Sequence, residues 1–137
     1  MNARIADKIK EIEAYLKELR SIKPKSYSAY EKDLKSKAAC ERYFEKITES
    51  LVDLAFLVIK DNGLKMPEDD KEAFSILEKS GLIDANLCRK LREAKGMRNL
   101  IAHEYGSVDD KLVFEAITSE IESDARLFLR AVKKEHK

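Results

Sequence analysis

Apolar residues recur at steps of three and four along most of the chain, and this spacing limits the fold more than any other feature. The longest such run extends from Ser28 to Asn62 without a proline or a glycine, and its stripe comprises Leu34, Phe44, Ile47, Leu51, Leu54 and Val58. Because residues three and four apart share one helix face, the run predicts an amphipathic helix of about 35 residues that ends at Asn62 and Gly63. Such a helix is roughly 50 Å long, which exceeds the width of a globule of this size. We therefore expect its first turns to project or to pack on a second subunit.

The same periodicity predicts four shorter helices. The first has Asn2 as its cap and ends before Pro24, with an inward stripe of Ile5, Ile9, Ile12, Leu16 and Leu19. Another has Pro67 as its first residue, ends at Ser80 and Gly81, and is expected to bury Ala73, Phe74 and Leu77. The last two begin after Asp84 and near Asp109, and the segment from Met97 to Ser107 lies between them.

Composition agrees with an all-α fold. Hydrophobic residues make up 44% and charged residues 39% of the 137 residues, whereas there are only four glycines, two prolines and no tryptophan. This balance suits amphipathic helices and disfavours sheet. We predict a single helical bundle over residues 1–137, with about five helices, one of them long, and a dimeric assembly. The absence of an 18-residue apolar run and of a signal-peptide profile predicts a cytoplasmic protein with no membrane span.

Neither charge nor cysteine content suggests a special class of protein. The net charge of +1 excludes binding of nucleic acid by an overall basic excess, so such a contact needs a local patch. Residues 89–98 hold five basic residues against one acid, and Arg89, Arg92 and Lys95 are the candidates for an RNA-binding patch; the alternative is a solvated helix face. Cys40 and Cys88 lack zinc-site spacing and are expected to be reduced and buried, and no metal site is predicted.

A second candidate surface for nucleic acid combines aromatic and basic residues. Tyr27, Tyr30 and Tyr43 lie near several lysines, an arrangement that also occurs on ordinary protein surfaces. Glu49 and Asp53, four residues apart on one helix face, either contribute to a metal site or form ion pairs with neighbouring basic residues.

Arg98 and His103 are the residues best suited to chemistry. An imidazole can accept and return a proton, and a guanidinium matches a pair of phosphate oxygens, so together they suit phosphodiester cleavage. On a continuous helix, however, two residues five apart are separated by about 140°. Either the helix opens just before Gly106, or two such segments meet across a dimer. The competing interpretation is that Arg98 pairs with Asp53 or Glu49 and that His103 caps a helix end.

The segment that contains this pair resembles the signature of the HEPN superfamily, in particular its HepT-type toxin branch. The shared features are an arginine, a polar residue, three apolar or small residues, a histidine and, after one more residue, a tyrosine, here Arg98, Asn99, Leu100, Ile101, Ala102, His103 and Tyr105. The likeness extends to the long helix and to the segment around Pro67, Phe74, Leu77 and Gly81. In the N-terminal half only a charge pattern matches.

The resemblance implies an all-helical homodimer that cuts RNA without a metal or another cofactor, with the reactive residues in a cleft between the subunits. It implies Arg98 as the residue that steadies the phosphate, His103 as the acid or base, and Asn99 as a supporting residue. It also implies a minimal nucleotidyltransferase antitoxin that attaches AMP to Tyr105. The alternative function is that of a non-catalytic helical partner of such a nucleotidyltransferase.

Overall fold

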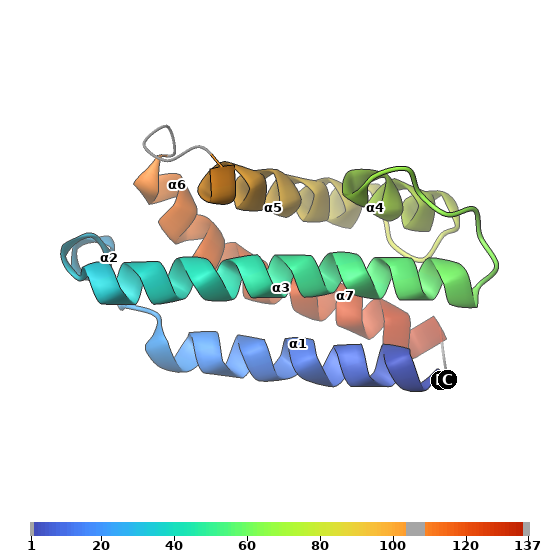
Figure 1. Cartoon of the computed structure of the whole chain (residues 1–137), viewed down its shortest axis with the longest axis horizontal. Helices are drawn as coiled ribbons and strands as arrows, with labels where there is room; N and C mark the ends of the chain where they lie inside the picture. The colour runs from blue at the N-terminus through green and yellow to red at the C-terminus, as the bar shows by residue number, and fades with distance from the viewer. Residues whose placement is uncertain (1, 104–108, 136–137) are drawn as a thin grey trace.

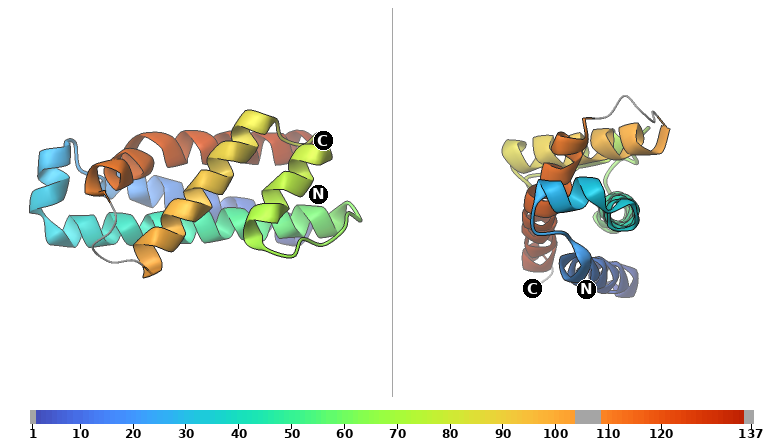
Figure 2. Two further views of the ribbon diagram at one scale, coloured as in Figure 1. Left: turned by 90° about the horizontal axis from the view of Figure 1, so that it is seen from above. Right: turned by 90° about the vertical axis from the view of Figure 1, so that its left-hand side faces the viewer.

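The structure, a computed structural model, describes residues 2–103 and 109–135, and this part of the chain is helical throughout apart from its connections. The elements are α1 (Ala3–Ile22), α2 (Tyr27–Lys32), α3 (Leu34–Asp61), α4 (Asp70–Lys79), α5 (Ala85–His103), α6 (Asp110–Glu115), the π-helix η1 (Ala116–Glu120) and α7 (Ile121–Glu135). Helix α3 packs along α1, and α5 crosses over α3 and α7 (Figures 1 and 2). The predicted all-α fold is confirmed.

Several predicted helix boundaries are confirmed by capping contacts. The side chain of Asn2 accepts a hydrogen bond from the backbone N–H of Arg4 at 2.7 Å. Gly63 and Gly81 follow the ends of α3 and α4 with φ values of 67° and 88°, which side-chain-bearing residues rarely adopt. Helix α4 begins at Asp70 rather than at Pro67, because Asp69 accepts a hydrogen bond from the N–H of Glu72 and thereby caps it.

The apolar stripes meet in one core between the helices. The predicted inward residues of α1 are all buried, as are Ala73, Phe74 and Leu77 of α4. The largest completely buried side chains include Tyr30, Phe44, Phe74 and Phe128, and the last two make an edge-to-face contact with ring centroids 6.1 Å apart. Cys40 and Cys88 are free and buried, as predicted.

The prediction of one helix from Ser28 to Asn62 is wrong at its N-terminal end. Asp33 divides this run into α2 and α3, and its carboxylate accepts hydrogen bonds from the N–H groups of Lys35 and Ser36. Helix α2 does not continue the axis of α3, because its Tyr30 is completely buried and packs on Phe114 of α6. The two ring centroids are 5.2 Å apart. Leu34, which was expected on the buried stripe, is 75% exposed.

The C-terminal helical segment contains a π turn that its apolar spacing explains. Val113, Ile117, Ile121 and Ala125 are all buried and follow one another at steps of four. In a regular α-helix each such step rotates the stripe by about 40°, so the stripe would leave the core. The wider turn at Ala116–Glu120 compensates for this rotation. The Nζ of Lys23 donates to the carbonyl oxygen of Thr118 in this turn, at 2.9 Å.

No helix in the described part of the chain is long and apolar enough to cross a bilayer.

Candidate active site

Helix α5 is continuous from Ala85 to His103 and therefore contains both Arg98 and His103. The expectation that the segment from Met97 to Ser107 lies between helices is wrong for its first seven residues. On this uninterrupted helix, Arg98 and His103 lie about 140° apart around the axis. Arg98 is partly buried on the side that faces the bundle, whereas His103 is exposed. One copy of the chain therefore does not bring the two side chains together through helical spacing.

Arg98 faces Glu49 of α3. Its Nε lies 2.8 Å from Glu49 Oε1, and this nitrogen is fully buried. The contact is an ion pair whose N–H does not point at the oxygen, because Nε has no hydrogen-bond partner of good geometry among the described residues. The predicted pairing of Arg98 with Glu49 is thus observed. Asp53, the other predicted partner, instead forms an ion pair with Lys8, with 3.5 Å between Asp53 Oδ2 and Lys8 Nζ.

Lys95 lies one turn earlier on α5 and is almost completely buried. Its Nζ is 2.7 Å from Glu49 Oε1 and 3.1 Å from Asp70 Oδ2, and its side chain is 8% exposed. The ammonium group therefore joins α5 to both α3 and the first turn of α4. Lys95 does not belong to an exposed basic patch, so its assignment to an RNA-binding surface is wrong.

Asn99 lies beside Arg98, and its Oδ1 is 3.4 Å from Arg98 Nη1, at the outer limit of a hydrogen bond. Around the helix axis it is about 40° from His103, so Asn99 and His103 occupy neighbouring positions on one side of α5. Tyr105 lies outside the described residues. The segment that contains it is bounded by His103 on one side and by Asp109, the cap of α6, on the other.

The other two residues of the predicted patch, Arg89 and Arg92, are exposed on α5. With Lys71 of α4 they line a groove of about 380 Å³ between the two helices, in which three cations outnumber the two carboxylates of Glu78 and Glu93. Arg92 donates to Ser75 Oγ at 2.8 Å, and Arg89 forms an ion pair with Glu93 at 3.1 Å. Lys71 was not predicted, because it belongs to another helix. It approaches α5 at Gly96, where a Cβ atom would lie 3.4 Å from its Nζ.

Of the three tyrosines considered for an aromatic surface, Tyr30 is buried, whereas Tyr27 and Tyr43 are partly exposed. Tyr30 is completely buried, and Tyr27 makes an edge-to-face contact with Phe114, with centroids 5.6 Å apart. Tyr43 packs edge-to-face on Tyr15. Tyr30 is thus unavailable to nucleotide bases, while the rings of Tyr27 and Tyr43 each contact a neighbouring aromatic side chain.

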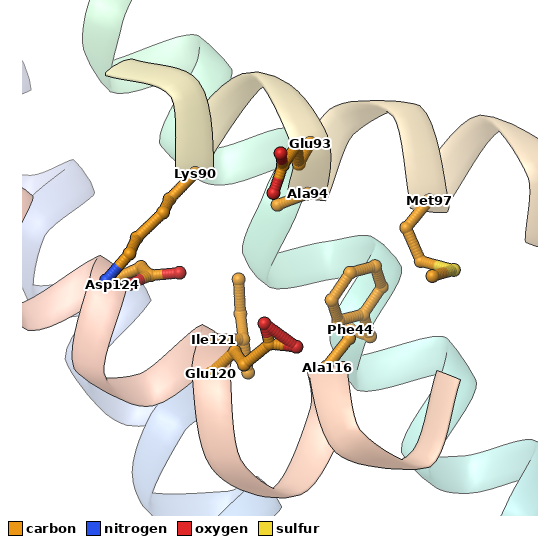
Figure 3. Close-up of a pocket in the computed structure, with 9 residues that line it drawn as sticks. All are labelled: Phe44, Lys90, Glu93, Ala94, Met97, Ala116, Glu120, Ile121 and Asp124. Carbon is orange, nitrogen blue, oxygen red and sulfur yellow. Dashed lines mark ion pairs between the residues drawn. The ribbon is translucent and has the colours of Figure 1, made fainter. Parts of the chain in front are cut away.

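A separate hollow of about 110 Å³ lies on another flank of α5, between this helix, α3 and the π turn (Figure 3). Phe44, Met97 and Ile121 supply apolar walls, and Lys90 forms an ion pair with Asp124 at 3.8 Å. Burial raises the pKa of Asp124 above its ordinary value. Because three carboxylates and one ammonium line the hollow, its charge is unsuited to a phosphate. In the described part of the chain, no three His, Cys, Asp or Glu side chains are grouped so as to hold a metal ion.

Comparison with known proteins identifies the family. The family described as "Ribonuclease HepT-like" matches residues 8–132. The chain belongs to this HepT-like ribonuclease family. Its relatives include the mRNA nuclease HepT of Shewanella oneidensis, which is 23% identical over 135 residues, or 98% of this chain and 100% of that protein. A protein of Archaeoglobus fulgidus is 35% identical over 69 residues, so the matched segment spans about half of each chain (50% and 52%).

Solved structures confirm the HepT-like fold. A tri-AMPylated HEPN toxin of Shewanella oneidensis in complex with an MNT antitoxin superimposes with a TM-score of 0.90 at 22% identity, covering 98% of this chain and 99% of that one. The cytosolic protein YutE of Bacillus subtilis, of unknown function, gives a TM-score of 0.80 at 14% identity, covering 97% and 88%. At these identities the similarity establishes a shared helical architecture.

Proposed function

We propose that this HepT-like chain is the RNA endonuclease toxin of a toxin–antitoxin pair and acts as a homodimer. The observation that carries the proposal is the continuity of α5 through His103. It holds Arg98 on the bundle side and His103 on the exposed side of one rigid helix. Two such helices, placed face to face by a two-fold axis, combine an arginine and a histidine from each copy in one cleft.

The proposed reaction uses the ribose 2′-hydroxyl as the nucleophile. The 2′-oxygen attacks the adjacent phosphorus, and a His103 side chain accepts the hydroxyl proton. The bond from phosphorus to the 5′-oxygen then breaks, and this oxygen takes a proton from an acid, for which the second His103 of the dimer is available. The products are a 2′,3′-cyclic phosphate and a 5′-hydroxyl. Arg98 stabilises the charge that develops on the phosphate oxygens, and Asn99 supports its orientation.

Arg89 and Arg92, together with Lys71, are proposed to bind the RNA backbone in the groove between α4 and α5. Neutralisation is proposed to occur by attachment of AMP to Tyr105, catalysed by a nucleotidyltransferase antitoxin. The similar Shewanella structure is described as an AMPylated toxin in complex with an MNT antitoxin, which supports this part of the proposal. An added nucleotide two residues after His103 would place negative charge where the RNA phosphate binds.

The decisive experiment is incubation of the purified protein with total cellular RNA in EDTA, in parallel with His103→Ala. Cleavage by the wild type alone, with cyclic phosphate ends, is the expected result. Cleavage by both proteins at equal rates would place the active site elsewhere. If neither protein cleaves RNA although both are folded dimers, the chain is a non-catalytic partner of a nucleotidyltransferase.

A further inference from the structure

One carboxylate oxygen lies in contact with two cations of α5. Oε1 of Glu49 is 2.7 Å from Lys95 Nζ and 2.8 Å from Arg98 Nε. Lys95 is itself held by a second carboxylate, because its Nζ lies 3.1 Å from Asp70 Oδ2. The two cations are three residues apart, so they project from nearly the same side of the helix toward α3. The cluster thus ties three helices together directly beneath the proposed catalytic arginine.

In this arrangement, the two hydrogen-bonding edges of the Arg98 guanidinium have different surroundings. The Nε edge is buried against Glu49, whereas Nη1 lies 3.4 Å from Asn99 Oδ1, toward the side of α5 that bears His103. An arginine can present either edge to a phosphate, and a long side chain samples several rotamers. A carboxylate fixed at Nε leaves the two terminal nitrogens as the edge that can receive a phosphate.

Lys95 also limits how strongly Glu49 neutralises Arg98. Because both cations share Oε1, the negative charge of Glu49 is divided between them. If Lys95 were absent, Glu49 would be free to form a full ion pair with Arg98, and Asp70 would lose this cation.

We propose that Glu49, held in place by Lys95, is a positioning residue that fixes the Arg98 guanidinium for contact with the RNA phosphate. This inference rests on the proposed ribonuclease function, since it assigns Arg98 to the phosphate. Glu49 acts through Arg98 and does not itself exchange a proton with the substrate. A guanidinium that is free to rotate would reach the productive geometry less often, and displacements of about 1 Å cost roughly a hundredfold in rate.

The test compares Glu49→Gln with Glu13→Gln. Glu13 is a matched control because its side chain is 40% exposed, against 39% for Glu49, and it forms an ion pair of 2.9 Å with Lys133, far from α5. We expect Glu49→Gln to lower kcat about tenfold to a hundredfold with KM changed less than about twofold, while Glu13→Gln leaves both near wild type. Both limbs of the pH–rate profile should persist in Glu49→Gln, and Glu49→Asp should recover part of the lost rate.

Two kinetic outcomes would overturn the proposal. An unchanged kcat per folded dimer in Glu49→Gln would show that the carboxylate serves stability alone. Loss of one limb of the pH–rate profile would show that Glu49 is itself an acid or base in the reaction.

A second measurement is independent of turnover. Loss of the ion pair should free the buried Nε edge of Arg98 to reach solvent. The Nε–Hε resonance of Arg98, identified by its absence in Arg98→Lys, should therefore exchange with solvent at least about tenfold faster in Glu49→Gln than in the wild type or in Glu13→Gln. Equal exchange in all three proteins would reject the positioning role. If the wild type cleaves no RNA, the proposed ribonuclease function fails, while this exchange measurement still decides whether Glu49 orients Arg98.

Discussion

Replacement of Lys95 by methionine tests whether this lysine is a buried structural group or a surface contact for RNA. Methionine keeps most of the aliphatic stem but removes the ammonium that lies between Glu49 and Asp70. Loss of one partner from a buried ion pair costs about 3–5 kcal/mol. Here the two carboxylate side chains are 39% and 41% exposed, so water can solvate them, and the expected loss of unfolding free energy is about 2 kcal/mol. For a chain of this size that corresponds to a melting temperature lower by roughly 6–8 °C.

The assay is thermal and urea unfolding of Lys95→Met beside Arg92→Met at equal protein concentration. Because Arg92 is exposed, its replacement should change the unfolding free energy by less than about 0.5 kcal/mol. Amine acetylation of the folded wild type provides a second readout, in which Lys95 should react far more slowly than the exposed Lys79 of α4. A Lys95→Met variant as stable as the wild type, together with rapid acetylation of Lys95, would refute the burial argument.

Three further predictions concern neutralisation, pH and packing. Tyr105→Phe should still cleave RNA but escape inactivation by the nucleotidyltransferase, and unchanged inactivation in a co-expression assay would exclude Tyr105 as the acceptor. Hydrogen bonds from Arg20 hold the pKa of Glu122 below its ordinary value of 4.5. The folded state therefore binds this proton more weakly than the unfolded state, so the contribution of Glu122 to stability is present above pH 4.5 and is lost as the pH falls through the folded pKa. Glu122→Gln should flatten the curve of unfolding free energy against pH in this range. A curve identical to that of the wild type would show that Glu122 does not contribute to this pH dependence. Tyr30→Phe should raise the unfolding free energy by about 1 kcal/mol in urea titrations, because the buried hydroxyl has no hydrogen-bond partner among the described residues; a loss of stability would reveal such a partner.

Most of the helices, and several of their ends, can be predicted from the sequence because those ends depend on local chemistry. The cap at Asn2, the ends of α3 and α4 at Gly63 and Gly81, and the buried faces all follow from residue types within one or two turns. The break at Asp33 is different, because helical spacing continues across it. It depends on the burial of Tyr30 against Phe114, a residue more than eighty positions away, which periodicity does not reveal.

The candidate site shows the same division between local and distant information. Arg98, Asn99 and His103 are recognisable because they lie within six positions of one another, and their pattern is that of a known family. The burial of Lys95 cannot be recognised from nearby residues in this way. A lysine among other basic residues is typical of a solvated helix face, and only the approach of Glu49 and Asp70 from two other helices makes its burial favourable. Lys71 likewise reaches the groove beside Arg89 and Arg92 only through the tertiary contact between α4 and α5.

The wide turn at Ala116–Glu120 sets the angle by which α6 is rotated about the helix axis relative to α7. If this turn kept all its residues but adopted regular α-helical hydrogen bonds, α6 would rotate by about 100° relative to α7, because the wide turn accommodates about one residue more than a regular helix. Phe114 would then turn away from Tyr27 and Tyr30, and α6 would lose its attachment to α2. Since the segment that follows His103 ends at Asp109, the cap of α6, the wide turn also sets the position of the far end of that segment, although it is remote from the proposed catalytic residues.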